Sequence, residues 1–249
     1  MFSNTKRFVA LASLIFIAAG FAFSQQDDEE ELSVEESYLQ ESMEVMVIRE
    51  QTRADSRDMK LVALDFIKDA IDAGRANEEV TRSLEYLALE GTVNRTRDGG
   101  LGRLTNNYPD VRTKAVEYLG ELGTEEAKTA VVRVLLADNE PMVLTQAVKA
   151  LGKFNHEDNG EVVAAISWIV TRFDVLNPDN ALALAALEAF ETMAAANGGL
   201  RDPVAVRTVM RIAEGTYIRP VRMRALAVLR NLKNGGSSKN ADESRKGGM

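Results

Sequence analysis

A helical phrase that occurs four times constrains this chain more than any other feature of its sequence. The copies AVEYLGELG, AVKALGKFN, ALEAFETMA and ALAVLRNLK begin at Ala115, Ala147, Ala186 and Ala225, which are 32, 39 and 39 residues apart. Each copy opens on a small residue, and an aliphatic or aromatic residue follows four positions later, as one buried helical stripe requires. Periods of this length predict two-helix units that stack side by side.

The segments between the copies predict the second helix of each unit. These helices are expected at 125–137, 160–173 and 203–214, and none is expected after the last copy. Every proline of the chain falls near a predicted first turn, where a missing N–H costs little. The prolines are Pro109, Pro141, Pro178, Pro203 and Pro220.

Helix caps are predicted at the same breaks. The expected N-caps are Thr124, Asn177 and Asp202, and the glycines expected just past C-termini are Gly74, Gly91, Gly123 and Gly215. No segment shows a run of alternating apolar and polar residues with hairpin turns. The ordered part is therefore predicted to be all-α.

The first copy resembles the bacterial HEAT-like repeat, the type also found in phycobilin lyases. It matches through Asp110, Val111, Arg112, Ala115, Leu119, Gly120, Leu122, Gly123 and Ala127. The copy from Pro220 keeps Val221, Arg222, Ala225 and Leu229, whereas the copy at Met142 has Leu144 where the pattern prefers arginine. The resemblance implies a right-handed α-solenoid of about four to five repeats, which serves as a scaffold and whose second helices line the concave side.

The first 24 residues predict export. Lys6 and Arg7 precede an apolar run from Phe8 to Phe23, and small residues before Gln25 suit cleavage by a signal peptidase. The alternative is a retained membrane anchor, although the apolar run is short for a spanning helix. The chain has no cysteine, which excludes a lipoprotein anchor and disulfides. With a bacterial type of repeat, the predicted location is the periplasm, with no stable membrane anchor after cleavage.

The predicted organisation has four parts. They are a signal peptide at 1–24, an acidic arm with a helix at 25–55, the repeat solenoid at 56–233 with an inserted loop at 92–108, and a disordered tail at 234–249. The solenoid is long enough to bury its own core. The tail is rich in glycine and polar residues, which favours disorder.

Charge is unevenly placed along the chain. Residues 27–50 hold ten acidic residues and one arginine, whereas residues 201–233 hold eight basic residues and two acidic ones. Opposite poles favour contact between copies, a possible homo-oligomer, or partners of different charge. The alternative is that these charges only solvate exposed faces and that some of the arginines form ladders within a repeat.

The acidic arm carries a second signal. Ser33 to Glu36 has the pattern of a capping box, and Leu39, Met43, Met46 and Val47 follow at helical spacing. The expected role is an N-terminal helix that covers the first repeat. The alternative is a helix that inserts into a groove of a partner.

The loop at 92–108 interrupts the repeat spacing and is predicted to be a flexible connector or a protein-contact loop. Arg95, Arg97 and Arg103 surround its glycines, so they are candidate contact residues. A nucleotide site is not expected, because no lysine follows the glycines and no strand precedes them. Arg207, Arg211 and Arg219 of the last repeat are the other candidate contact residues.

Signatures of an enzyme are missing. The single histidine, His156, stands in a turn with Glu157 and Asp158, which is expected to be a surface turn rather than a cation site. Trp168, Phe173 and Phe190 are predicted to lie in the core. No catalytic residue, metal site or cofactor is expected.

The predicted function is that of a non-enzymatic periplasmic scaffold. It would bind protein partners in an envelope-associated assembly such as motility, secretion or cell-wall machinery, and the sequence does not choose among these. The alternative is a protein of the bilin-lyase type that handles a tetrapyrrole or another small ligand, which follows from fold resemblance alone. A nucleic-acid partner is not expected, because the chain is acidic and carries an export signal.

Overall fold

The computed structural model describes residues 34–99, 102–154, 160–176, 178–197, 199–200 and 202–246. The chain divides into two units, residues 1–41 and 42–249, and each is described by itself. In the first unit, the described residues are the opening turns of α2 (Val34–Arg53). The predicted signal peptide and the Ser33 end of the predicted capping box lie outside the described residues.

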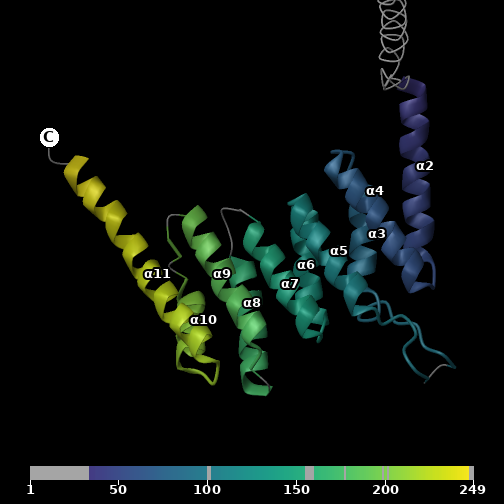
Figure 1. Ribbon diagram of the computed structural model, residues 1–249. Coiled ribbons are helices and arrows are strands. Elements are labelled where there is room, and N and C mark those ends of the chain that lie inside the picture. The colour runs from purple at the N-terminus through teal and green to yellow at the C-terminus, as the bar shows by residue number, and fades with distance from the viewer. Residues whose placement is uncertain are drawn as a thin grey trace, which may run out of the picture. The chain divides into compact units, whose positions relative to one another are not determined.

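The second unit is a stack of helices, and all regular elements of its described part are α-helices. After α2 come α3 (Arg57–Asp72), α4 (Glu78–Leu89), α5 (Pro109–Leu122), α6 (Glu125–Ala137), α7 (Pro141–Lys153), α8 (Gly160–Leu176), α9 (Asn180–Ala196), α10 (Pro203–Glu214) and α11 (Arg219–Lys246). Figure 1 shows α3 to α11 following one another in chain order.

The helices form two layers. The first helices α3, α5, α7, α9 and α11 pack each on the next, and so do the second helices α4, α6, α8 and α10. Neighbouring helices of the two layers also pack together, such as α4 with α5 and α10 with α11. The described part thus holds four helix pairs and a final unpaired helix, which confirms the predicted all-α solenoid.

Local sequence signals place the helix ends. The helices α6 and α10 have the predicted bounds, and α8 continues a few residues further than predicted. The predicted N-caps are confirmed at α6, where Thr124 Oγ1 accepts from the Ala127 N–H at 3.2 Å, and at α10, where Asp202 Oδ1 accepts from the Val204 N–H at 2.7 Å. Asn177 lies outside the described residues, and Asp179 caps α9 instead.

Close approach between first helices depends on two glycines. A Cβ atom at Gly120 would lie 2.8 Å from Ala150 Cβ, and one at Gly152 would lie 2.8 Å from Ala189 Cα. The backbone of one first helix therefore contacts a small side chain of the next. Beside these contacts, Leu119, Leu151 and Phe190 fill the core and have no exposed area. The small residues of the repeated phrase set the distance between repeats.

A buried ion pair joins the first complete repeats. Arg112 on α5 is 1% exposed, and its Nε donates to Asp138 Oδ2 at 2.6 Å. Its Nη1 donates to Asn107 Oδ1 at 2.8 Å and to the Glu90 carbonyl at 3.3 Å. Asp138 also accepts from the backbone N–H groups of the two residues after it, at the start of α7. One guanidinium thus connects the ends of α4 and α6 with α5.

Helix α2 contacts the first repeat by a different face from the predicted one. Ile48 is 1% exposed and joins the core, whereas Met43 and Met46 are each 64% exposed. Glu44, Ile48 and Thr52 are spaced four residues apart, so they share one helical face, and Glu44 on that face accepts from Arg75 at 3.0 Å. The buried face is shifted by one position from the predicted stripe.

The last helix also differs from the sequence prediction. Helix α11 continues to Lys246, past Asn234, where the disordered tail was expected to begin. No proline follows Pro220, so the helical hydrogen bonds can continue, although Gly235 and Gly236 each cost about 1 kcal/mol relative to alanine.

Replacing Gly152 by alanine tests the close packing of the first helices. In an open helix this change would stabilise by about 1 kcal/mol. Here the new Cβ meets Ala189, and we expect the free energy of unfolding to fall by about 1–3 kcal/mol. Urea denaturation measures the change, with Lys153→Ala on the exposed side as the control, expected within about 0.5 kcal/mol of the wild type. A stabilised Gly152→Ala variant would show that the helices are not in close contact.

Asp138→Asn tests the buried ion pair. It leaves Arg112 buried beside a neutral amide, so we expect a loss of about 3–5 kcal/mol in the free energy of unfolding. The matched control is Glu85→Gln, which removes the acid of the exposed pair with Arg133 and should cost less than about 1 kcal/mol. Equal losses of unfolding free energy in the two variants would contradict the prediction that the buried pair stabilises the fold more than the exposed pair does.

Candidate partner-binding groove

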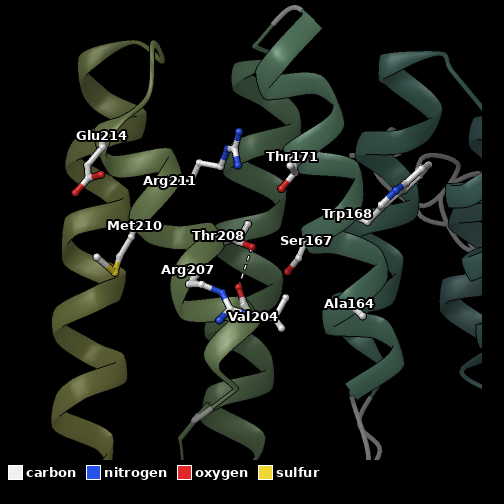
Figure 2. Close-up of a pocket in the computed structure, with 10 residues that line it drawn as sticks. All are labelled: Ala164, Ser167, Trp168, Thr171, Val204, Arg207, Thr208, Met210, Arg211 and Glu214. Atoms are coloured by element: carbon white, nitrogen blue, oxygen red, sulfur yellow. Dashed lines mark hydrogen bonds between the residues drawn. The ribbon is translucent and has the colours of Figure 1, made fainter.

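A groove of about 610 Å³ lies between the second helices α8 and α10. Figure 2 shows its lining side chains, which come from both helices. They are Ala164, Ser167, Trp168, Thr171, Val204, Arg207, Thr208, Met210, Arg211 and Glu214. The groove thus combines apolar side chains, hydroxyl groups and two arginines.

Trp168 stands at the rim of this groove, so its prediction as a core residue is wrong. Its side chain is 45% exposed, and the guanidinium of Arg172 lies 5.4 Å from the ring centroid, in cation–π contact. The core face of α8 is formed by residues such as Ile166 and Ile169. Arg172 follows Trp168 by four positions and shares its face, so this charge is the signal that places the tryptophan outside the core.

Helix α10 contributes two arginines spaced by one turn. Arg207 is exposed, and it has no hydrogen bond or ion pair with any residue that the structure describes. Arg211 donates from Nε to Asp174 Oδ2 at 2.6 Å. Figure 2 shows the Arg211 side chain extending from α10 toward Thr171 on α8. Both residues were predicted as contact residues, and the structure brings them together in one groove.

Tyr217 and Asp174 hold Arg211 in place. Tyr217 is 5% exposed, and burial raises the pKa of its phenol, as does the Asp174 carboxylate beside it. Asp174 therefore stands between a buried neutral phenol and the Arg211 guanidinium. This contact uses the Nε atom of Arg211, and its Nη groups have no hydrogen-bond partner among the described residues.

Arg211 is also one step of an arginine ladder along the second helices. Arg133, Arg172 and Arg211 are spaced by 39 residues each. Arg133 on α6 pairs with Glu85 on α4, Arg172 on α8 donates to Asn139 Oδ1 at 2.5 Å, and Arg211 pairs with Asp174 on α8. Each arginine reaches back to the preceding repeat. The sequence predicted ladders within a repeat as one alternative, whereas these contacts join one repeat to the one before it.

The floor of the groove contains a hydroxyl group without a partner. Ser167 is 4% exposed, and its Oγ atom has no hydrogen-bond partner among the described residues. In Figure 2 this hydroxyl lies on the side of α8 that faces α10. The neighbouring Thr208 is satisfied, because its Oγ1 donates to the Val204 carbonyl at 2.9 Å. A buried polar atom left without a partner is uncommon and calls for an explanation.

A second groove, of about 540 Å³, lies on α4 and α6 and carries the opposite charge. Its lining includes the acidic residues Glu78, Glu85 and Glu126, with Arg82 as the basic residue. Arg82 pairs with Glu78 at 2.5 Å, and Glu85 pairs with Arg133 of the ladder. The two grooves on the second helices therefore differ in the charge that they offer a partner.

The predicted arginines of the inserted loop lie apart from the α8/α10 groove. Arg95 Nε donates to the Thr92 carbonyl at 2.6 Å, and Arg97 Nη1 donates to the Gly102 carbonyl at 3.1 Å. Arg103 is exposed, and Arg219, the first residue of α11, is exposed and does not line the groove. Two of the three loop arginines thus support the backbone of their own loop.

Hydrogen bonds fix the base of the inserted loop, so this part is not the flexible connector that was one prediction. Asn106 accepts from the Thr96 N–H at 2.9 Å and donates to the Asn94 carbonyl at 2.8 Å. Below it, Lys60 Nζ lies 2.9 Å from Glu90 Oε1, and both residues are buried. Burial raises the pKa of Glu90, although the Lys60 ammonium acts in the opposite direction.

Some predictions lie outside the described residues. His156, Glu157 and Asp158 are among these. Within the described ranges, no group of three or more histidine or acidic residues is placed to hold a metal ion. None of the helices in the described part has the length and apolar character needed to cross a membrane. Phe190 is buried and Phe173 is partly buried against the core, as predicted.

Comparison with known protein families identifies the class of protein. Residues 101–172 match the family model of HEAT repeats. This range contains α5, α6, α7 and most of α8, and the two-layer packing continues on both sides of it. The chain is therefore a HEAT-like helical repeat protein. The match is to HEAT repeats in general, so the phycobilin-lyase type and the tetrapyrrole alternative stay predictions. A search of curated proteins found no match.

The raised pKa of Glu90 predicts a pH dependence. A glutamate in the unfolded chain titrates near about pH 4.3, and the folded protein holds this proton more tightly. The stability contributed by the protonated carboxyl is full below that pH and is lost as the pH rises through the native pKa. We expect the free energy of unfolding of the wild type, relative to Glu90→Gln, to fall with rising pH and then to level off. Urea denaturation over a pH series checks this, and a rising difference would contradict it.

Proposed function

We propose that this protein is a non-enzymatic scaffold that binds protein partners in an envelope-associated assembly of the periplasm. HEAT repeats commonly mediate protein–protein interaction, and here the second helices offer an open groove. The observation that carries the proposal is the lining of this groove, which includes the exposed Trp168 and Met210 and also Arg207, an arginine without a partner among the described residues. Tryptophan and arginine are the residues that most often dominate the energy of protein interfaces.

The position of these side chains supports a partner rather than a structural role. Trp168 is 45% exposed and Met210 is 45% exposed, so neither fills the core. Large apolar side chains that gather on one exposed surface mark interaction sites. The two residues belong to different repeats, and a partner in the groove would therefore contact two repeats at once.

The proposed location is supported by the sequence at the start of the chain. The basic residues Lys6 and Arg7 and the apolar run that follows them have the pattern of a cleavable export signal. Candidate assemblies remain motility, secretion and cell-wall machinery. Arg95, Arg97, Arg103 and Arg219 stay predicted contact residues outside the groove.

Photo-crosslinking in intact cells tests the proposed function. A photoreactive phenylalanine analogue at Met210 is expected to form adducts with a protein of the periplasmic fraction, because this side chain lines the groove. The same analogue at Met223, which is exposed on α11 but outside the groove, is the matched control. Adducts at Met223 without adducts at Met210, or none at either position, would contradict the proposal.

A further inference from the structure

We propose that the groove between α8 and α10 binds an acidic segment of a partner protein in extended conformation. The inference rests on the proposed function and deepens it, because it states the chemistry of the partner. The residues that carry it are Arg207, Arg211 and Ser167. Each offers a hydrogen-bonding atom that the described part of the chain does not use.

The charge of the groove selects an acidic ligand. Arg207 has no hydrogen bond or ion pair with the described residues, and the contact of Arg211 with Asp174 uses Nε, which leaves its Nη groups without a partner among those residues. Glu214 is the one acidic residue in the lining. By contrast, the lining of the α4/α6 groove includes Glu78, Glu85 and Glu126. A carboxylate is therefore attracted by one groove and repelled by the other, which gives specificity as well as attraction.

The spacing of the two arginines fits an extended chain. Residues four apart on a helix are separated by a rise of about 6 Å. In an extended segment, alternate side chains point the same way and are separated by about 6.6 Å. Acidic residues at positions i and i+2 of the partner would thus face Arg207 and Arg211 together. Asp174 and Tyr217 fix Arg211 in advance, so less side-chain entropy is lost on binding.

Ser167 provides the contact to the partner's main chain. Its Oγ atom is buried in the groove floor without a hydrogen-bond partner. A backbone N–H or carbonyl group of an extended segment would satisfy it, since such a segment has free main-chain groups. Ala164, Val204 and Met210 of the same lining leave apolar surface beside the arginines, which an apolar side chain of the partner would cover.

The protein carries its own reporter for the test, because Trp168 is the single tryptophan of the chain and stands at the groove rim. The purified full chain is titrated with a peptide that contains no tryptophan. In this peptide Asp and Glu are separated by one leucine. The change in tryptophan emission measures binding. The comparison peptide has the same sequence with Asn and Gln in place of the acids.

We expect the acidic peptide to change the emission and the neutral peptide not to do so, with an affinity that falls as salt is added. Arg207→Glu should weaken binding by more than about tenfold. Ser167→Ala should weaken it about three- to tenfold without loss of stability, because the hydroxyl makes no hydrogen bond with the described residues. The matched control is Arg222→Glu, an equal charge change at an exposed site on α11 outside the groove.

Three results would overturn the inference. The first is equal binding of the neutral peptide, and the second is an equal loss of affinity in Arg207→Glu and Arg222→Glu. The third is binding of a peptide made of residues 27–36 of this chain, an acidic sequence, when the unrelated acidic peptide does not bind. That result would identify a second copy of the chain as the occupant.

The failure of this inference can be told apart from failure of the proposed function. If Met210 forms protein adducts and the neutral peptide displaces the partner as well as the acidic peptide does, the scaffold function stands. The inference that the partner segment is acidic would then be wrong. A peptide that binds as expected while Met210 forms no protein adduct in cells would remove the scaffold function instead.

Discussion

The ion pair of Arg112 and Asp138 is the interaction on which the first half of the repeat stack depends. Two charges in a site that is 1% exposed on each side need full satisfaction. Here Nε and Nη2 of Arg112 both donate to the Asp138 carboxylate, and Nη1 donates to the Glu90 carbonyl and to Asn107. Through Arg112, the end of α4, the inserted loop and the turn between α6 and α7 share one hydrogen-bonded centre. The loop is therefore a built part of the stack.

The next copy keeps the close packing of the first helices but not the ion pair. The position equivalent to Arg112 in the next copy is Leu144, which is fully buried and apolar. In that copy, Gly152 lets α7 approach α9 so closely that no side chain fits between them. The repeat pattern thus accepts either a paired arginine or a buried leucine at this position, while the close glycine contact is present in both copies.

Much of the fold could be predicted from the sequence because it depends on local rules. Proline at the first turn and Thr124 and Asp202 at N-caps act within a few residues, so α6 and α10 have the predicted bounds. The groove was only half predictable. Arg207 and Arg211 could be named, but the partner of Arg211 is Asp174, 37 residues earlier, and only the packing of α8 against α10 brings them together.

The predicted place of Trp168 in the core was wrong for a related reason. Its size and apolar character favour burial, but the face of α8 on which it lies is decided by its neighbours at four-residue spacing. Nothing in a single sequence marks Ser167 either, since its importance comes from the hydrogen-bond partner that it lacks.

The arginine ladder and the glycine contacts respond differently to salt. On the second helices, exposed pairs of Arg133 with Glu85 and of Arg211 with Asp174 add to the apolar packing between neighbours; such pairs are worth about 0–1 kcal/mol and are screened by salt. The first helices carry exposed pairs of the same kind, such as Arg57 with Asp110 and Arg224 with Glu191, and they also have close glycine contacts that do not depend on ions. The contacts of Gly120 and Gly152 therefore hold the distance between repeats at any ionic strength, in the layer of first helices, while the groove opens on the layer of second helices.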